Sequence, residues 1–280
     1  MNQTYMKEKK IFPLVMSMAL PMMLSMAFNS LYNIVDSYFV AKLSEDAMTA
    51  LSLVYPAQNL LTAVAVGFGV GVNAMISFYL GAQNQEKADK TATQGIVLGV
   101  LHGVLLMLLF LCGMNWFLGM FTKSDAVRAL GMEYSNVVFL FSVIVTGGIT
   151  LEKIFQAVGR MRATMVSMIA GFVTNIVLDP LLIFGIGPFP RMEIAGAALA
   201  TGIGQVITLL VYIIYYVLDP LPVKLRRTYL RPEGEICGKT YGIGIPATLN
   251  MALPSLLISA LNGILAAYSG AYVLVLGVYY

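Results

Sequence analysis

The sequence is poor in charged residues. Charged side chains make up 11% of the 280 residues and 59% of the residues are hydrophobic, whereas a soluble domain carries about a quarter charged residues. This scarcity of charge excludes an ordinary soluble domain. The formal net charge of +3 is too small to indicate a nucleic-acid-binding surface. The composition is that of a membrane protein, with the lipid bilayer as its surroundings.

Cysteine and histidine are also scarce. Cys112 and Cys237 lie far apart and form no metal-type or redox-type pair, so both are interpreted as free thiols. His102 is the only histidine, which argues against a histidine metal cluster and against a nucleophile–base pair in the membrane. The sequence therefore predicts a protein that is not an enzyme and that holds no organic cofactor or structural metal.

The sequence contains long runs without charged residues. They cover residues 11–35, 47–85, 91–122, 134–151, 163–190 with Asp179 as the one interruption, 194–218 and 240–280. About 20 apolar residues span the hydrocarbon of a bilayer, so the run 240–280 is expected to break near Tyr268–Ala271. The predicted fold is an all-α, polytopic transmembrane bundle. It consists of an N-terminal six-helix lobe, a seventh helix and the start of an eighth.

Lysine and arginine are distributed unevenly over the connecting segments. With the N-terminus inside, the inner segments hold Lys7, Lys9, Lys10, Lys87, Lys90, Lys153, Arg160, Arg162, Lys224, Arg226, Arg227, Arg231 and Lys239. The outer segments hold only Lys42, Lys123, Arg128 and Arg191. Because cytoplasmic loops are enriched in basic residues, we expect a multi-pass protein of the plasma (inner) membrane with a cytoplasmic N-terminus.

The segment 219–239 is the expected domain boundary. It contains three prolines and several basic residues but no apolar run, and it is interpreted as a cytoplasmic linker. The linker separates an N-terminal lobe, residues 1–218, from residues 240–280, which begin a C-terminal lobe that the sequence leaves incomplete.

The start of the expected second lobe repeats the sequence pattern of the first helix. "MALPMMLSMAFNSLYN" from Met18 is similar to "GIGIPATLNMALPSLLISALN" from Gly242 when Pro21 is aligned with Pro246. Both segments start on the inner side, so a duplication predicts a parallel two-lobe repeat in the complete protein. A shared apolar composition is the alternative explanation of this similarity.

Polar residues inside the apolar runs follow the helical period. Asn29, Asn33 and Asp36 are spaced i, i+4 and i+7 in the first helix, and Thr201, Gln205 and Thr208 repeat this spacing in the sixth. Such stripes favour a polar cavity between helices. Interhelical hydrogen bonds alone are the alternative, and Asp36 is also compatible with a position near the outer interface.

The stretch "NIVLDPLLIF", residues 175–184, places Asn175 and Asp179 on one face of the fifth helix. Pro180 has no N–H and clashes with the carbonyl of Ile176, so it is expected to kink the helix and free backbone carbonyls. Ionisable residues within the membrane are functional hypotheses by default. Asp36 and Asp179 are therefore predicted to bind and release a proton or Na⁺.

Several stretches carry a resemblance to a known family. They are "ALPMMLSMAFNSLYNIVDSYFVAKLSEDAMTAL", "ISFYLGAQNQEKADK", "FQAVGRMRATM", "NIVLDPLLIFG" and "GAALATGIGQ". The sequence resembles the multidrug and toxic compound extrusion (MATE) transporters along nearly the whole chain. The resemblance implies a V-shaped protein of two six-helix lobes that exports organic cations or drugs in exchange for H⁺ or Na⁺. This chain would supply the amino-terminal lobe and need the missing C-terminal lobe to transport.

The resemblance also implies a site. In the bacterial branch typified by DNA-damage-inducible F-like transporters, the coupling pattern falls on Asp36, Asn175, Asp179 and Thr201, with the Ala197 carbonyl as a further ligand. The position of Thr201 depends on the preceding loop "GIGPFPRME", which varies in length. Another branch uses a Glu in the seventh helix, and "TLNMALPSLLIS" has none. Candidate cavity-lining residues are Asn29, Asn33, Gln156 and Gln205.

Two other functions stay open from the sequence. A lipid-linked oligosaccharide flippase of the same superfamily would favour a cavity rich in basic residues, which the mid-span regions lack. A non-transporting single lobe that serves as an assembly partner is the second alternative.

Overall fold

The computed structural model describes residues 10–279, and every regular element in this range is helical. The helices are α2 (Ile11–Ala41), α3 (Glu45–Gly81), α4 (Gln85–Phe121), α5 (Asp125–Val138), η1 (Phe139–Phe141), α6 (Ser142–Ala157), α7 (Met161–Phe184), α8 (Glu193–Leu218), η2 (Arg227–Tyr229), α9 (Gly234–Ala266) and α10 (Gly270–Tyr279). Seven helical segments are long and apolar enough to cross a bilayer, the fourth of them formed by α5, η1 and α6 together. The prediction of an all-α transmembrane bundle is confirmed.

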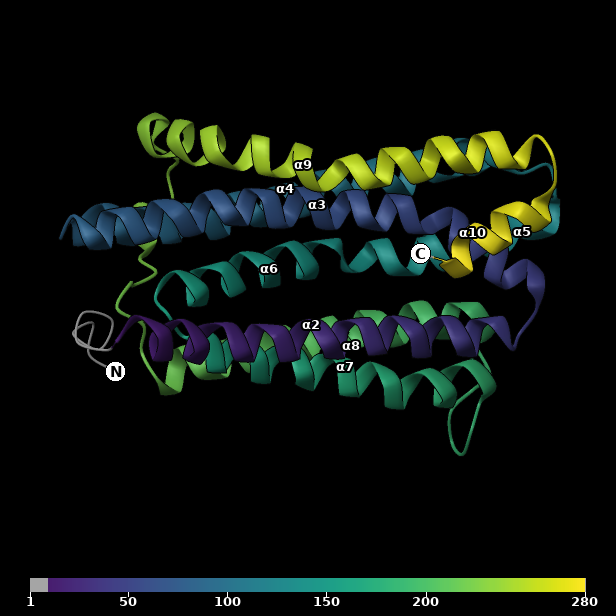
Figure 1. The fold of residues 1–280 in the computed structure, drawn as a ribbon, viewed down its shortest axis with the longest axis horizontal. Coiled ribbons are helices and arrows are strands. Elements are labelled where there is room, and N and C mark those ends of the chain that lie inside the picture. The colour runs from purple at the N-terminus through teal and green to yellow at the C-terminus, as the bar shows by residue number, and fades with distance from the viewer. Residues whose placement is uncertain (1–9, 280) are drawn as a thin grey trace.

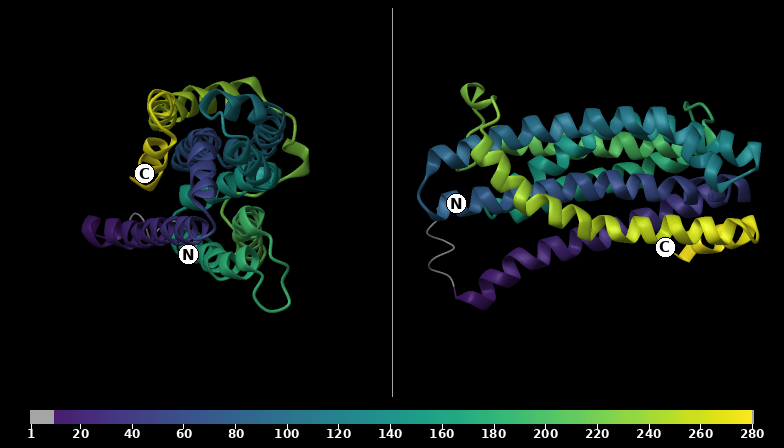
Figure 2. Two further views of the ribbon diagram at one scale, coloured as in Figure 1. Left: turned by 90° about the vertical axis from the view of Figure 1, so that its right-hand side faces the viewer. Right: turned by 90° about the horizontal axis from the view of Figure 1, so that it is seen from above.

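The long helices run along the longest dimension of the molecule (Figure 1). Helices α2, α7 and α8 pack together as one group, and α3, α4 and α9 as another. Helix α6 contacts both groups and lies between them. The end-on view in Figure 2 shows α2 on the opposite side of the bundle from α9.

Successive helices alternate in direction, so their connections gather at two ends of the bundle (Figure 1). We call one of them the basic end because its helix termini and loops carry Lys10, Lys87, Lys90, Arg160, Arg162, Lys224, Arg226, Arg227, Arg231 and Lys239. The opposite end carries Lys42, Lys123, Arg128 and Arg191.

Short polar side chains begin several of the helices. Ser44 accepts a hydrogen bond from the Ala47 N–H at 3.0 Å, and Asn84 accepts one from the Lys87 N–H at 3.1 Å. These side chains satisfy backbone donors that a helix leaves unpaired at its first turn. Helix α7 ends at Phe184 and is followed by Gly185, whose φ of 70° lies in the left-handed region that glycine adopts without strain.

Two helix boundaries differ from the charge-free runs. Helical structure extends from α5 to α6 over residues 125–157, well beyond the expected run 134–151, because α5 carries charged residues on its exposed face. Helix α9 begins at Gly234, within the segment predicted as linker. The charge-free runs mark the part of each helix that can lie in the hydrocarbon core of the bilayer. The helices themselves can extend beyond these runs. The predicted break in the last run is present between α9 and α10.

The connection from α8 to α9 is fastened along the first turns of α4. The buried Asp89 side chain accepts a hydrogen bond from the Lys224 N–H at 2.9 Å, and its other oxygen lies 3.4 Å from Arg226 Nε. Gln85 donates both to Asp89 at 2.8 Å and to the Pro222 carbonyl at 2.8 Å. The connection is thus held in place by backbone as well as side-chain groups.

Further along, Thr93 accepts from the Arg226 N–H at 3.1 Å and Gln94 from the Glu233 N–H at 3.1 Å. Ion pairs nearer the surface join α4 to the end of the connection and the start of α9: Lys90–Glu233 and Lys87–Glu235. A further pair, Arg160–Asp219, joins the start of the connection to the residue before α7. Exposed pairs of this kind contribute little to stability, so the buried hydrogen bonds are the firmer attachment.

Close packing of α7 on α8 sets the geometry of the polar site. A Cβ added at Gly204 would lie 2.8 Å from the Gly171 carbonyl oxygen and 3.3 Å from Asn175 Cβ. Only glycine therefore permits the two backbones to approach this closely, as small residues do between membrane helices. Gly204 brings the preceding turn of α8 to the face of α7 that carries Asn175.

Candidate functional site

Asn175 and Asp179 form the centre of a buried polar group on α7. Their exposed fractions are 2% and 0%. Asn175 Nδ2 donates to Asp179 Oδ1 at 3.2 Å across one helical turn, as the i, i+4 spacing allows. The same amide nitrogen donates to Thr201 Oγ1 on α8 at 3.3 Å. One side chain thus joins the carboxylate of its own helix to the hydroxyl of the next.

Asp36 enters from α2, which packs along α7. Its exposed fraction is 7%, and it lies within electrostatic reach of Asp179. One turn earlier, the ring of Tyr32 stacks on that of Phe172 of α7, with centroids 5.2 Å apart and planes within 4°. Because Asp36 and Asp179 both lie near the C-terminal ends of their helices, the acidic pair lies in the half of the bundle away from the basic end.

Thr201 and Ala197 lie one turn apart on α8. Ala197 is fully buried in the apolar core beside the site, whereas Thr201 is half-buried and reaches Asn175. The other polar residues of this stripe do not join the group. Thr208 donates to the Gly204 carbonyl of its own helix at 3.0 Å, and Gln205 is half-buried.

The sequence-based prediction of the site does not include three residues that lie near it: Tyr32, Gln58 and Tyr134. Both tyrosine hydroxyls lie within electrostatic range of Asp36 and Asp179. Tyr134 of α5 is buried, and its hydroxyl accepts a hydrogen bond from Gln58 Nε2 of α3 at 3.3 Å. Tyr32 precedes Asp36 by one helical turn, which is a usable signal. Nothing in the local sequence links Gln58 or Tyr134 to α2.

Several oxygens of the site are buried without a hydrogen-bond partner. They are Asp36 Oδ1, Asn175 Oδ1 and Asp179 Oδ2. Within residues 10–279, no lysine, arginine or histidine forms an ion pair with either carboxylate. Buried polar groups are normally paired, and an isolated buried charge is costly. Carboxylate and amide oxygens are the ligands that hard cations prefer, so this arrangement is chemically suited to a proton or a small cation.

The remaining cavity candidates lie apart from the acidic pair. Asn33 donates to Asn29 Oδ1 at 2.7 Å on the same helix, and Asn33 is exposed. Gln156 lies near the basic end of α6, where it donates to Glu152 at 2.7 Å and accepts from Lys153 at 3.0 Å. The structure thus brings together Asp36, Asn175, Asp179 and Thr201 and places Gln156 in a second polar cluster.

Pro180 follows the acidic residue directly. Helix α7 continues through it to Phe184, with the bond to the Ile176 carbonyl lost because proline has no N–H. The series of backbone hydrogen bonds in α7 is therefore interrupted next to Asp179. The helix can bend at this point.

Comparison with known proteins identifies the family. The family model MatE matches residues 21–181. The chain is 31% identical over 265 residues to the multidrug export protein MepA of Staphylococcus aureus (strain NCTC 8325 / PS 47) and 29% identical to MepA of Staphylococcus saprophyticus. Each match covers 94% of this chain and 58% of the relative, so the chain spans about three-fifths of the length of these relatives.

Solved structures agree with the sequence matches. A multidrug resistance MATE family transporter of the MOP superfamily in its inward-facing conformation superposes with a TM-score of 0.82 at 28% identity, covering 93% of this chain and 59% of that one. An outward-facing structure of such a transporter gives a TM-score of 0.79 at 27% identity, covering 85% and 52%. The chain is a multi-pass membrane protein and belongs to the multidrug and toxic compound extrusion (MATE) family of transporters.

Proposed function

We propose that this chain carries the ion-coupling site of a secondary antiporter that exports organic cations in exchange for H⁺ or Na⁺. The observation that carries the proposal is the buried pair Asp36 and Asp179, which has unpaired oxygens and no basic partner in the described chain. The names of the relatives, which are multidrug export proteins, support the substrate class. The proposed activity is transport by alternating access, with no covalent step.

The proposed mechanism uses the contact between α2 and α7. A cation held between Asp36 and Asp179 removes the repulsion between their carboxylates and favours close packing of the two helices. Release of the cation favours their separation, with Pro21 in α2 and Pro180 in α7 as points of bending. Ion binding thereby shifts the population of inward- and outward-open states, as differential affinity requires.

The membrane potential drives such an exchange when more positive charges enter than leave, for example two H⁺ or Na⁺ for each monovalent organic cation, because a one-for-one exchange moves no net charge. One elementary charge that moves down 100 mV releases about 2.3 kcal/mol, which corresponds to a concentration ratio of roughly fifty. For the ion to enter from outside, the acidic pair must be reached from the outer face. This fits an orientation in which the basic end and the N-terminus are cytoplasmic, as the distribution of lysine and arginine predicts, in the plasma membrane.

The proposal is tested by driven efflux. The transporter, expressed in full from its gene, is reconstituted in vesicles, and efflux of a cationic dye is recorded under an imposed pH gradient or Na⁺ gradient. Asp36→Asn and Asp179→Asn are each expected to abolish gradient-driven efflux. Asp125→Asn, an exposed position on α5, is the matched control and should transport normally. Undiminished efflux in both site variants would refute the assignment, and the gradient that drives the wild type identifies the ion.

A further inference from the structure

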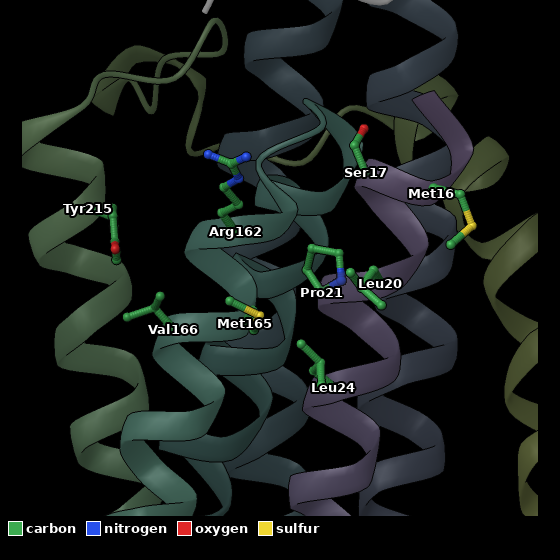
Figure 3. A pocket seen from close by; sticks show the side chains of 9 residues that line it. All are labelled: Met16, Ser17, Leu20, Pro21, Leu24, Arg162, Met165, Val166 and Tyr215. Atoms are coloured by element: carbon green, nitrogen blue, oxygen red, sulfur yellow. The ribbon is translucent and has the colours of Figure 1, made fainter. Parts of the chain in front are cut away.

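A pocket of about 410 Å³ lies between α2, α7 and α8 near the basic end (Figure 3). This volume falls within the range of sites that bind small ligands or parts of larger ones. The pocket lies toward the basic end of helices whose acidic residues, Asp36 and Asp179, lie near the other end. It is therefore separate from the proposed coupling site.

The lining of the pocket changes from polar to apolar with depth. Arg162 lies in the first turn of α7, and Tyr215 lies in the last turn of α8, so both are close to the basic end. Leu24 of α2 and Met165 and Val166 of α7 follow further into the bundle, as Figure 3 shows. A pocket with a cationic side chain at its mouth and apolar side chains deeper inside is complementary to an amphiphile that has an anionic head group and a hydrocarbon tail.

Arg162 has no acidic partner, in contrast to its neighbour Arg160. Arg160 forms an ion pair with Asp219, whereas no ion pair or hydrogen bond of the Arg162 side chain is present within residues 10–279. Arg162 is exposed, and its guanidinium lies at the mouth of the pocket (Figure 3). The N-terminus of α7, which no side chain caps, adds to the positive potential there.

The apolar walls face outward. Leu20, Leu24 and Val166 are exposed by 51%, 44% and 41%. In a membrane-spanning bundle, side chains of this kind at the bundle surface are covered by acyl chains. Tyrosine and arginine are the residues that meet lipid head groups at the membrane interface. The occupant with both the charge and the shape for this pocket is a membrane lipid.

We propose that the pocket between α2, α7 and α8 is a binding site for an anionic phospholipid of the leaflet at the basic end. The Arg162 guanidinium binds the phosphate, Tyr215 borders the head group, and one acyl chain lies against Leu20, Leu24, Met165 and Val166. Because the lipid contacts α2 and α7 together, its presence favours the arrangement in which these two helices stay packed. The site is inferred without reference to the proposed coupling function, although a lipid bound there would act on the same pair of helices.

Fluorescence quenching tests the site with the chain itself. Trp116 is the only tryptophan, so the parent protein carries Trp116→Phe and Tyr215→Trp, which place a single indole at the pocket mouth. The parent is reconstituted in phosphatidylcholine vesicles that contain a fixed fraction of brominated phosphatidylglycerol. A matched set contains the same fraction of brominated phosphatidylcholine. We expect the phosphatidylglycerol to quench more strongly than the phosphatidylcholine.

Variants of the parent assign that preference to one side chain. Arg162→Gln is expected to weaken the preference for phosphatidylglycerol roughly fivefold, the ratio that about 1 kcal/mol per basic residue represents. Arg162→Lys should retain most of it because the charge is kept. Arg231→Gln is the matched control, since Arg231 is exposed at the same end outside the pocket. Size-exclusion chromatography confirms that each variant stays folded.

Three results would overturn the proposal. Equal quenching by the two lipids in the parent would show that the pocket does not select an anionic head group. An unchanged preference in Arg162→Gln would place the selectivity elsewhere. Absence of quenching by either lipid would show that no lipid chain enters the pocket. Failure of dye efflux in the coupling-site variants has no bearing on any of these readouts.

Discussion

The Asn175 amide donates to Asp179 at 3.2 Å and to Thr201 at 3.3 Å, so one side chain connects a buried carboxylate on α7 to α8. Its own Oδ1 is buried without a partner. Asn175 therefore has two functions in the proposed site. It fixes the carboxylate, and it offers an oxygen to a bound cation.

Asn175→Ala removes both functions. A hydrogen bond to a charged group contributes about 1.5–3 kcal/mol, so gradient-driven dye efflux is expected to fall roughly tenfold or more. Thr174→Ala is the matched control, because the Thr174 hydroxyl donates only to the Ala170 carbonyl of its own helix at 2.7 Å. Equal efflux by the two variants in the vesicle assay would show that Asn175 is structural only.

Asp36 and Asp179 are expected to act as one unit. Asp36→Glu and Asp179→Glu keep the charge but displace it, which leaves rates that can be measured. Residues of a shared site give coupling energies of at least about 0.5 kcal/mol in a double-mutant cycle, so the double variant should deviate at least about twofold from the product of the two single effects. A cycle of Asp36→Glu with Asp125→Asn is the control. Strictly multiplicative efflux rates for Asp36 and Asp179 would mean two separate sites.

The sequence allowed the fold class and much of the α7 part of the site to be predicted. Residues four apart share a helix face wherever the helix packs, so Asn175 and Asp179 meet by local geometry alone. Gln58 and Tyr134 belong to helices that approach α2 only in the folded bundle. No local pattern encodes that approach.

The first helix shows where periodicity alone is insufficient. Asn33 and Asp36 are about 60° apart around a helix of 3.6 residues per turn. The polar stripe to which they belong is therefore wide enough for one of its residues to be buried and another exposed. Asp36 is buried, whereas Asn33 is exposed. The hydrophobic pattern identified the helix but could not say which side of the polar stripe α7 would cover.

Gly204→Ala is expected to destabilise the contact that positions Thr201. The new Cβ would lie 2.8 Å from the Gly171 carbonyl oxygen, and overpacking of this kind costs about 1–3 kcal/mol. The apparent Tm of the purified chain in detergent should fall, and efflux with it. Gly148→Ala in α6 is the control, because a Cβ there meets nothing within 4 Å. A Tm for Gly204→Ala at or above that of the control would show that α7 and α8 can separate without loss.

Asp89→Ala is expected to release the connection between α8 and α9. The buried Asp89 carboxylate accepts the Lys224 N–H at 2.9 Å and pairs with Arg226, and a buried donor left unpaired costs about 1–3 kcal/mol. Cleavage by trypsin after Lys224, Arg226 or Arg227 requires this segment to detach locally. Limited proteolysis of Asp89→Ala should therefore cut the connection severalfold faster than it cuts the wild type. Glu235→Gln disrupts only exposed ion pairs, those with Lys87 and Lys239, and should leave the rate unchanged, since such pairs contribute little. If the two variants were cut equally fast, the surface ion pairs rather than the buried carboxylate would hold the connection on α4.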